Sequence, residues 1–159
     1  MALAISVIVT TYNRPDALAA TLRGLAAQED RQFEVIIADD GSTGDTADAI
    51  REIQKTFPVP LQHVWHADQG FRAAAITNRA ITRSTGDYIV LMDGDCIPRP
   101  CFIGWHRKLA QPGWMVGGNR LLLSEDFTRR ILAEEIPVHS WKRSQWIMPR
   151  LRGWTNRML

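Results

Sequence analysis

The sequence has little of what marks membrane, secreted or cysteine-rich proteins. No apolar run approaches the roughly 20 residues that a membrane-spanning helix needs, and the N-terminal MALAISVIVT lacks the basic region and cleavage site of a signal peptide. The only cysteines, Cys96 and Cys101, match neither a zinc site nor a disulfide framework, which favours reduced structural thiols. We therefore expect a cytoplasmic protein.

Net charge is also scarce, but the charges are unevenly distributed. The 159 residues carry a net charge of only +2. Residues 1–100 hold 9 Lys and Arg against 13 Asp and Glu, whereas residues 101–159 hold 10 against 4. The basic C-terminal third predicts contact with something anionic, such as phosphates or a lipid surface.

Strand-like and helix-like segments alternate through the first hundred residues. Short apolar runs predict buried strands, and periodic segments between them predict helices. The expected strands are 5–13, 33–42, 61–67 and 87–92, and the expected helices are 14–28, 43–57 and 70–85. This alternation, with short connections, indicates an α/β fold with a parallel sheet flanked by helices.

The pattern changes after Pro100. We expect helices at 102–111 and 124–137, the second capped by Ser124, and a strand at 114–123 with a Gly-Gly break. We expect three tryptophans in the core: Trp65 before Pro100, and Trp105 and Trp114 after it. The remaining tail shows no clear periodicity.

Polar side chains gather where three of the expected strands end. In an open parallel sheet, ligands bind beyond the carboxyl ends of the strands. The chemically useful residues there include hydroxyls, an aromatic ring, an arginine and four carboxylates: Thr10, Thr11, Tyr12, Arg14, Asp39, Asp40, Asp93 and Asp95. Each cluster alone could be an ordinary polar loop, but the three together predict a binding site.

The segment YIVLMDGDC sets two carboxylates, Asp93 and Asp95, around one glycine at the end of a buried strand. Paired carboxylates of this kind suit a hard divalent cation that also bridges to phosphates. Bound metal would remove the repulsion between the two acids. The alternative is an Asp-Gly turn with solvated acids, because an isolated D-x-D is common.

Three segments resemble a known family in order and spacing. SVIVTTYNRPDAL, EVIIADDGSTGDT and GFRAAAITNRAITRSTGDYIVLMDGDC are similar to the nucleotide-sugar half of inverting family-2 glycosyltransferases, which have the GT-A fold, a Rossmann-like and mostly parallel sheet flanked by helices. The resemblance covers roughly residues 4–105. The form DGDCIPR is similar to bacterial enzymes that build surface polysaccharides.

The resemblance implies a role for each matching residue. Thr10 and Tyr12 would frame the base and ribose of the donor, Asp40 would accept a hydrogen bond from uracil, and Asp39 would support that loop. Arg72 would lie near the base and diphosphate, with Arg14 in the same nucleotide-binding set. Asp93 would lie near the ribose and metal, and Asp95 would bind Mn²⁺ or Mg²⁺ directly.

The resemblance also implies the reaction and its partners. The donor would be a nucleotide sugar, with a UDP-sugar as the family-level expectation, and the acceptor a saccharide or a lipid-linked molecule at the inner face of the membrane. The family places its general base in a later acidic motif with no clear equivalent here. Glu125 and Asp126 are the weak candidates, and their position after Ser124 is better explained as helix first-turn acids.

We therefore expect residues 1–105 to form a nucleotide-sugar-binding core and residues 106–159 an incomplete acceptor-side region. A non-catalytic nucleotide-sugar-binding module is the alternative. A sugar nucleotidyltransferase would need a glycine-rich phosphate loop after the first strand, and TTYNRPDA has none. No motif indicates nucleic-acid binding.

The tail mixes three tryptophans with basic residues, and two interpretations stay open. Such a segment can contact an anionic membrane surface, or it can pack against a missing C-terminal part. The residues concerned are Trp141, Lys142, Arg143, Trp146, Arg150, Arg152, Trp154 and Arg157.

Overall fold

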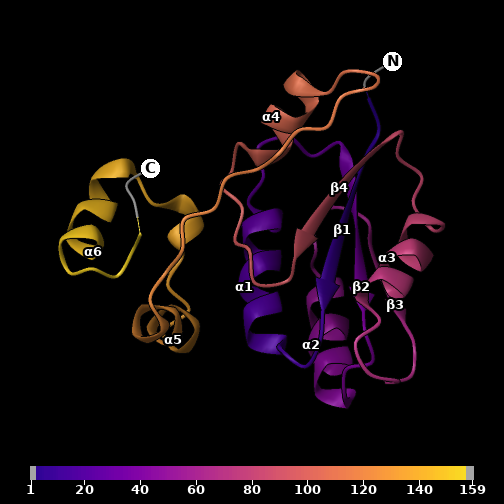
Figure 1. Cartoon of the computed structure of the whole chain (residues 1–159), viewed down its shortest axis with the longest axis horizontal. Coiled ribbons are helices and arrows are strands. Elements are labelled where there is room, and N and C mark those ends of the chain that lie inside the picture. The colour runs from indigo at the N-terminus through magenta and orange to yellow at the C-terminus, as the bar shows by residue number, and fades with distance from the viewer. Residues whose placement is uncertain (1–2, 157–159) are drawn as a thin grey trace.

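A four-stranded parallel sheet forms the centre of the computed structural model, which describes residues 3–156 (Figure 1). The strands are β1 (Ile5–Thr11), β2 (Phe33–Asp39), β3 (Leu61–Trp65) and β4 (Tyr88–Asp93), in the order β3-β2-β1-β4. They alternate with the helices α1 (Pro15–Ala26), α2 (Gly44–Gln54) and α3 (Ala73–Ile81). The predicted parallel α/β fold is confirmed.

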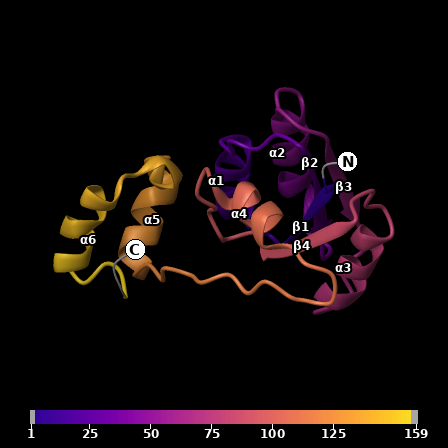
Figure 2. The ribbon, with the colours of Figure 1, turned by 90° about the horizontal axis from the view of Figure 1, so that it is seen from above.

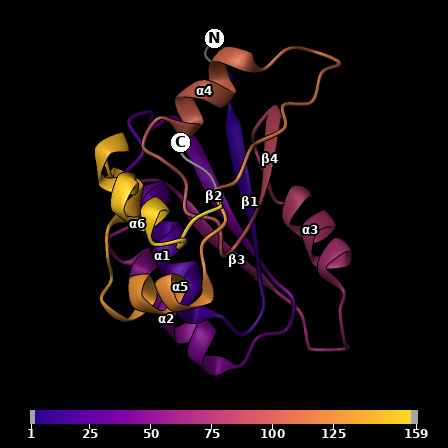
Figure 3. The same ribbon diagram turned by 60° about the vertical axis from the view of Figure 1, so that its left-hand side comes forward.

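Helices cover both faces of the sheet, which explains why β1 and β2 read as nearly continuous apolar runs. On one face, side chains of β1 and β2 pack with Leu22 of α1, Ile50 of α2 and Ile103 of α4 (Phe102–Leu109). On the other face, Ile8 and Ile36 pack against α3. Figures 2 and 3 show α3 alone on its side of the sheet.

The register aligns the carboxyl ends of the strands. Thr10 of β1 lies opposite Asp93 of β4, and Thr11 lies opposite Asp39 of β2. Just beyond β4, the Gly94 amide donates to the Thr10 carbonyl at 2.7 Å, and a Cβ on Gly94 would lie only 2.6 Å from that oxygen. The glycine is therefore required by its close approach to β1.

A buried carboxylate ties together the opposite end of the sheet. Glu34 at the start of β2 accepts hydrogen bonds from Ser6 of β1 at 2.7 Å and from the backbone amide of Thr85, which precedes β4, at 2.6 Å. The Thr85 hydroxyl and the Gln62 amide of β3 also donate to it. Glu34 thus connects three strands to the loop between α3 and β4.

The C-terminal part forms a small cluster of its own beside α1 (Figure 1). Its elements are α5 (Glu125–Ala133), the 3₁₀ turns η1 (Val138–Ser140) and η2 (Arg143–Trp146), and α6 (Ile147–Leu151). Ser124 caps α5, as predicted, by accepting from the Phe127 amide at 3.3 Å. Arg23 of α1 and Glu135 form an ion pair at 3.1 Å between this cluster and the sheet region.

The expected strand at 114–123 is wrong. This segment is extended without a strand partner, apart from a single bridge between Leu123 and Thr155. Alternating apolar residues alone do not make a strand when no neighbouring backbone is available for hydrogen bonding.

The expected core positions of three tryptophans are also wrong. Trp65, Trp105 and Trp114 are 48%, 54% and 75% exposed. Trp65 lies at the end of edge strand β3, and the other two lie on α4 and the extended segment, where no helix or strand covers them. Large aromatic rings are often only partly buried.

The tryptophans of the tail pack within it. Trp141, Trp146 and Trp154 surround Phe127 of α5, and Trp154 stacks on its ring with the centroids 4.9 Å apart. Trp146 is buried, and Trp141 and Trp154 are partly buried. Membrane contact of the tail and its packing against a further part both stay predictions; Arg157 lies outside the described residues. Within residues 3–156, no helix is long and apolar enough to cross a membrane.

Candidate functional site

A cleft of about 410 Å³ opens at the carboxyl edge of the sheet. Residues at the ends of β1 and β4, in the loops after all four strands and at the start of α3 line it, together with Arg120. This is the location predicted from the parallel topology. Seven predicted site residues meet there: Thr10, Thr11, Tyr12, Arg14, Asp40, Asp93 and Asp95. Sequence positions from 10 to 95 therefore converge on one cavity.

Asp93 and Asp95 form an exposed acidic pair in the lining of this cleft. Ligand atoms of these two residues and of Cys96 lie within 4.8 Å of one another. The chain turns at Gly94 directly after β4, so the two carboxylates converge. Two exposed carboxylates at this spacing fit a divalent cation that keeps some of its water ligands.

Cys96 is the less suitable third donor of that group. Burial raises the pKa of its thiol; Arg120 opposes the shift, and the Asp95 and Asp93 carboxylates add to it. The thiol is therefore protonated at neutral pH in the absence of a metal, and a protonated thiol is a poor ligand. The two aspartates carry the cation-binding character of the site.

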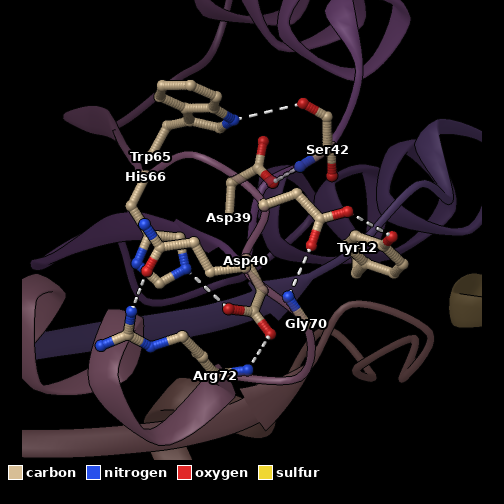
Figure 4. Close-up of polar contacts among 10 residues, drawn as sticks. Tyr12, Asp39, Asp40, Ser42, Trp65, His66, Gly70 and Arg72 are labelled. Atoms are coloured by element: carbon tan, nitrogen blue, oxygen red, sulfur yellow. Dashed lines mark hydrogen bonds and ion pairs between the residues drawn. The ribbon is translucent and has the colours of Figure 1, made fainter.

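Asp40 is held in one orientation from two sides (Figure 4). Its Oδ1 atom lies 2.7 Å from Nε2 of His66, and its Oδ2 atom accepts the backbone N–H of Arg72 at 2.9 Å. The residue is only 5% exposed, yet it lines the cleft. A carboxylate so fixed can accept a hydrogen bond from a ligand N–H without first losing rotational freedom.

Asp39 supports the same loop from inside the protein. It is fully buried, accepts the Ser42 amide at 2.8 Å and contacts Nε2 of His63 at 3.0 Å. Burial alone would raise its pKa, but the hydrogen bonds from His63 and Ser42 outweigh burial and leave the pKa lowered. Asp39 is thus an ionised structural residue outside the cleft.

Gly41 completes this loop because no other residue fits there. Its φ of +95° is strained for side chains with a Cβ. An added Cβ would also lie 2.6 Å from Cα of Asp68. The loop after β2 therefore packs closely against the loop after β3.

Tyr12 stands at the rim with half of its surface exposed. Its hydroxyl donates to Asp68 at 2.9 Å, a bond that raises the pKa of the phenol (Figure 4). Asp68 in turn accepts the Gly70 amide at 3.0 Å. The ring is fixed at its tip, while its exposed surface leaves room for a flat ligand to stack.

Besides Asp39, three predicted residues do not line the cleft. Arg72 contributes its backbone amide to Asp40, but its side chain turns to Gln69. Glu125 and Asp126 lie in the first turn of α5, where both pair with Arg129. Glu125 instead lines a second hollow, together with Arg14 and Asp16.

Sequence reasoning missed several residues of the site, among them His63, His66, Asp68 and Arg120. The first three belong to β3 or the loop after it, and the rule about strand ends would have found them had it been applied to the third strand as well. Arg120 had no such signal. It comes from the extended segment and pairs with Asp93 at 3.3 Å.

The family model of Glycosyl transferase family 2 matches residues 6–156. Among curated proteins, a hyaluronan synthase of Pasteurella multocida is 38% identical over 100 residues, which are 62% of this chain and 10% of that protein. The chain thus spans only a small part of this relative.

Two solved structures share the fold. The mannosyltransferase PcManGT of Pyrobaculum calidifontis, in complex with GDP-Man and Mn²⁺, is 28% identical, with a TM-score of 0.60. The match covers 68% of this chain and 32% of the mannosyltransferase chain. TarS 1–349 of S. aureus, in complex with UDP, is 26% identical, with a TM-score of 0.50. The match covers 58% of this chain and 28% of the TarS chain. Their sheet and helices match the GT-A architecture. Because the family model spans the sheet, the cleft and the C-terminal helices together, the chain belongs to glycosyl transferase family 2.

Proposed function

We propose that this protein binds a nucleotide sugar in the cleft and transfers the sugar to a saccharide or lipid-linked acceptor during the synthesis of a surface polysaccharide. One observation carries the proposal. A half-exposed aromatic ring, an oriented carboxylate and an acidic pair line the same cavity at the strand ends. These groups match the base, the ribose and the metal-bound diphosphate of such a donor.

The base would lie between Tyr12 and Asp40. A carboxylate accepts hydrogen bonds only, so it selects bases with a ring N–H at the pairing edge, which uracil and guanine have and adenine and cytosine lack. Uracil is the first choice, supported by the sequence resemblance and by the UDP complex of TarS. The GDP-Man complex of PcManGT makes guanine the alternative.

The diphosphate would lie near Asp93, Asp95 and Arg14. Asp95 and Asp93 would hold Mn²⁺ or Mg²⁺, as their converging oxygens allow. Such an ion would neutralise negative charge that develops on the departing nucleoside diphosphate. Thr10, whose hydroxyl lies 3.5 Å from Asp93, would help to orient that carboxylate towards the ribose and the ion.

The chemistry would be direct displacement with inversion. An acceptor hydroxyl attacks the anomeric carbon from the side opposite the nucleotide, and its proton passes to a general base. The carboxylates lining the cleft, Asp40, Asp93 and Asp95, are all assigned to donor binding. Glu125 and Asp126 stay weak candidates for the base, because they pair with Arg129 outside the cleft.

The domain division is part of this proposal. Residues 1–105 would bind the donor, and residues 106–159 would begin the acceptor side. Contact with an anionic lipid surface would involve Lys142, Arg143 and Arg152 together with the exposed Ile147 and Leu151 of α6. The tail tryptophans, being packed against α5, would take no part.

A nucleotide-sugar-binding module without turnover is the second candidate. It is favoured by the absence of an evident general base among the cleft-lining residues. Detectable sugar transfer or donor hydrolysis would exclude it.

The first experiment is calorimetric titration with UDP, with and without Mn²⁺, on the wild type and on Asp95→Asn. We expect Mn²⁺-dependent binding that Asp95→Asn abolishes. Asp48→Asn is the matched control, because Asp48 is an exposed aspartate on α2 paired with Arg51. Binding of GDP in place of UDP would overturn the assignment of the base, and binding of neither nucleotide would overturn the proposed function.

A further inference from the structure

Arg120 is the cation of the cleft that the family resemblance does not account for. It reaches the cavity from the extended segment between α4 and α5, which approaches the acidic pair from outside the sheet. Its guanidinium Nη1 lies 3.3 Å from Oδ2 of Asp93, and both side chains are 64% exposed.

The other cation of the cleft, Arg14, has a different partner. Its Nε atom bonds to Asp16 at 3.0 Å, on the first turn of α1. The positive charge of Arg14 is therefore balanced outside the acidic pair. Arg120 alone, among the described residues that line the cleft, forms an ion pair with an acid of the proposed metal site.

A divalent cation and a guanidinium compete for the same carboxylate. When Asp93 binds a metal, its oxygen is less available to Arg120, and the two positive charges repel at short range. The exposed ion pair is worth little, so exchange is easy. The freed guanidinium then lies beside the position proposed for the diphosphate, which arginine binds well through paired hydrogen bonds.

The backbone near Arg120 permits such a movement. Gly117 and Gly118 precede it, and a Cβ at either glycine would meet no heavy atom within 4 Å. The segment has no helix or strand hydrogen bonding between α4 and the bridge at Leu123. A reorientation of the Arg120 side chain from Asp93 towards a phosphate would therefore break no helix or strand hydrogen bond, while the neighbouring Leu121 stays packed on the C-terminal cluster.

We propose that Arg120 is an exchanging ligand: it neutralises Asp93 while the metal is absent, and it binds the donor diphosphate once a divalent cation takes Asp93. The binding of the donor diphosphate by Arg120 rests on the proposed function. The exchange of Arg120 for a metal ion at Asp93 does not depend on the proposed function.

The test measures two affinities that should change in opposite directions in Arg120→Gln. Mn²⁺ binding without nucleotide, measured from the electron paramagnetic resonance signal of free Mn²⁺, should tighten by about 2- to 5-fold because a competing cation is removed. UDP binding at saturating Mn²⁺, measured by calorimetry, should weaken about tenfold or more because charge-assisted bonds to phosphate are lost. Arg120→Lys should retain part of the UDP affinity.

The matched control is Arg51→Gln, which removes an exposed arginine paired with an aspartate on α2; it should change neither affinity. A weaker or unchanged Mn²⁺ affinity in Arg120→Gln would overturn the exchange. Unchanged UDP affinity would overturn the phosphate contact. If the wild type binds no nucleotide, the proposed function and the phosphate contact fall together, while the Mn²⁺ measurement still decides the exchange at Asp93.

Discussion

At the scale of single residues, the site depends on side chains that fix other side chains. Asp40 faces the cleft, but its orientation depends on His66 and on the Arg72 amide. Asp39 and Gly41 hold the backbone of the same loop. The orientation of Asp40, which is expected to contact a ligand, thus depends on groups behind it. Such supporting contacts can determine the affinity for the ligand.

Replacing His66 tests this dependence. His66→Leu should weaken UDP binding about 3- to 10-fold, because Asp40 loses a partly buried hydrogen bond and gains rotational freedom. His66→Gln should keep most of the affinity, since its amide can donate to the same oxygen. Calorimetric titration of both variants, with thermal unfolding as a check on folding, would settle the role. Equal UDP affinity in His66→Leu and the wild type would contradict it.

The sequence predicted the residues at strand ends better than their partners. Asp40, Asp93 and Asp95 could be placed because parallel strands end at a common edge, whatever the surrounding packing. The His66–Asp40 pair could not be placed without the order of the strands, because it requires β3 beside β2. Arg120 was beyond reach, since an extended segment carries no periodic signal.

At the scale of secondary-structure elements, the two ends of the sheet have different tasks. The carboxyl ends carry the cleft, while the amino ends are joined by Glu34 to Ser6, Gln62 and Thr85. Burial alone would raise the pKa of Glu34, but the hydrogen bonds from Thr85, Ser6 and Gln62 outweigh it and leave the pKa lowered. The ionised carboxylate therefore stabilises the fold.

This predicts a pH-dependent difference between the wild type and Glu34→Gln. A lowered folded-state pKa contributes stability above the unfolded-state pKa, near 4.5, and that contribution is lost as the pH falls through the folded-state value. At pH 7, Glu34→Gln should lower the free energy of unfolding by about 1–3 kcal/mol. The difference should shrink below pH 4.5 in urea titrations, and a constant difference from pH 7 to pH 3 would refute the argument.

Elements with alternating strand and helix patterns were predicted correctly, whereas those after Pro100 were predicted only in part. α4 and α5 were found from their apolar faces and the Ser124 cap. The extended segment was taken for a strand because apolar content does not reveal whether a pairing edge is near. The turns η1 and η2 and the short α6 hold together through tryptophan packing, which has no fixed spacing in sequence.

At the scale of the whole molecule, β4 is an exposed edge. Within residues 3–156 it pairs only with β1, and Leu91 on the face shared with α3 is 61% exposed. α3 packs mainly against β2, β1 and β3, and β4 contributes Ile89 to that contact. An open edge with an exposed apolar residue can pair with other chains.

Leu91→Lys should therefore reduce self-association. A charge on the edge strand disfavours sheet-to-sheet pairing between molecules. Light scattering at rising protein concentration should show less aggregate than in the wild type. Leu109→Lys is the control, because Leu109 is also half exposed but lies at the end of helix α4; a similar gain from both variants would indicate general solubility and not an edge effect.

The register of β1 between β2 and β4 has a further consequence, for the order in which the protein is made. Thr10 and Asp93 are neighbours in the sheet but 83 positions apart along the chain. The ribosome will have released Tyr12, Asp40 and His66 well before Asp93 and Asp95 emerge. A nascent chain could shape the loops after β1, β2 and β3 early, but the acidic pair proposed to bind a metal ion forms only when β4 has inserted beside β1. Binding of the proposed metal ion would thus report that β4 has joined the sheet.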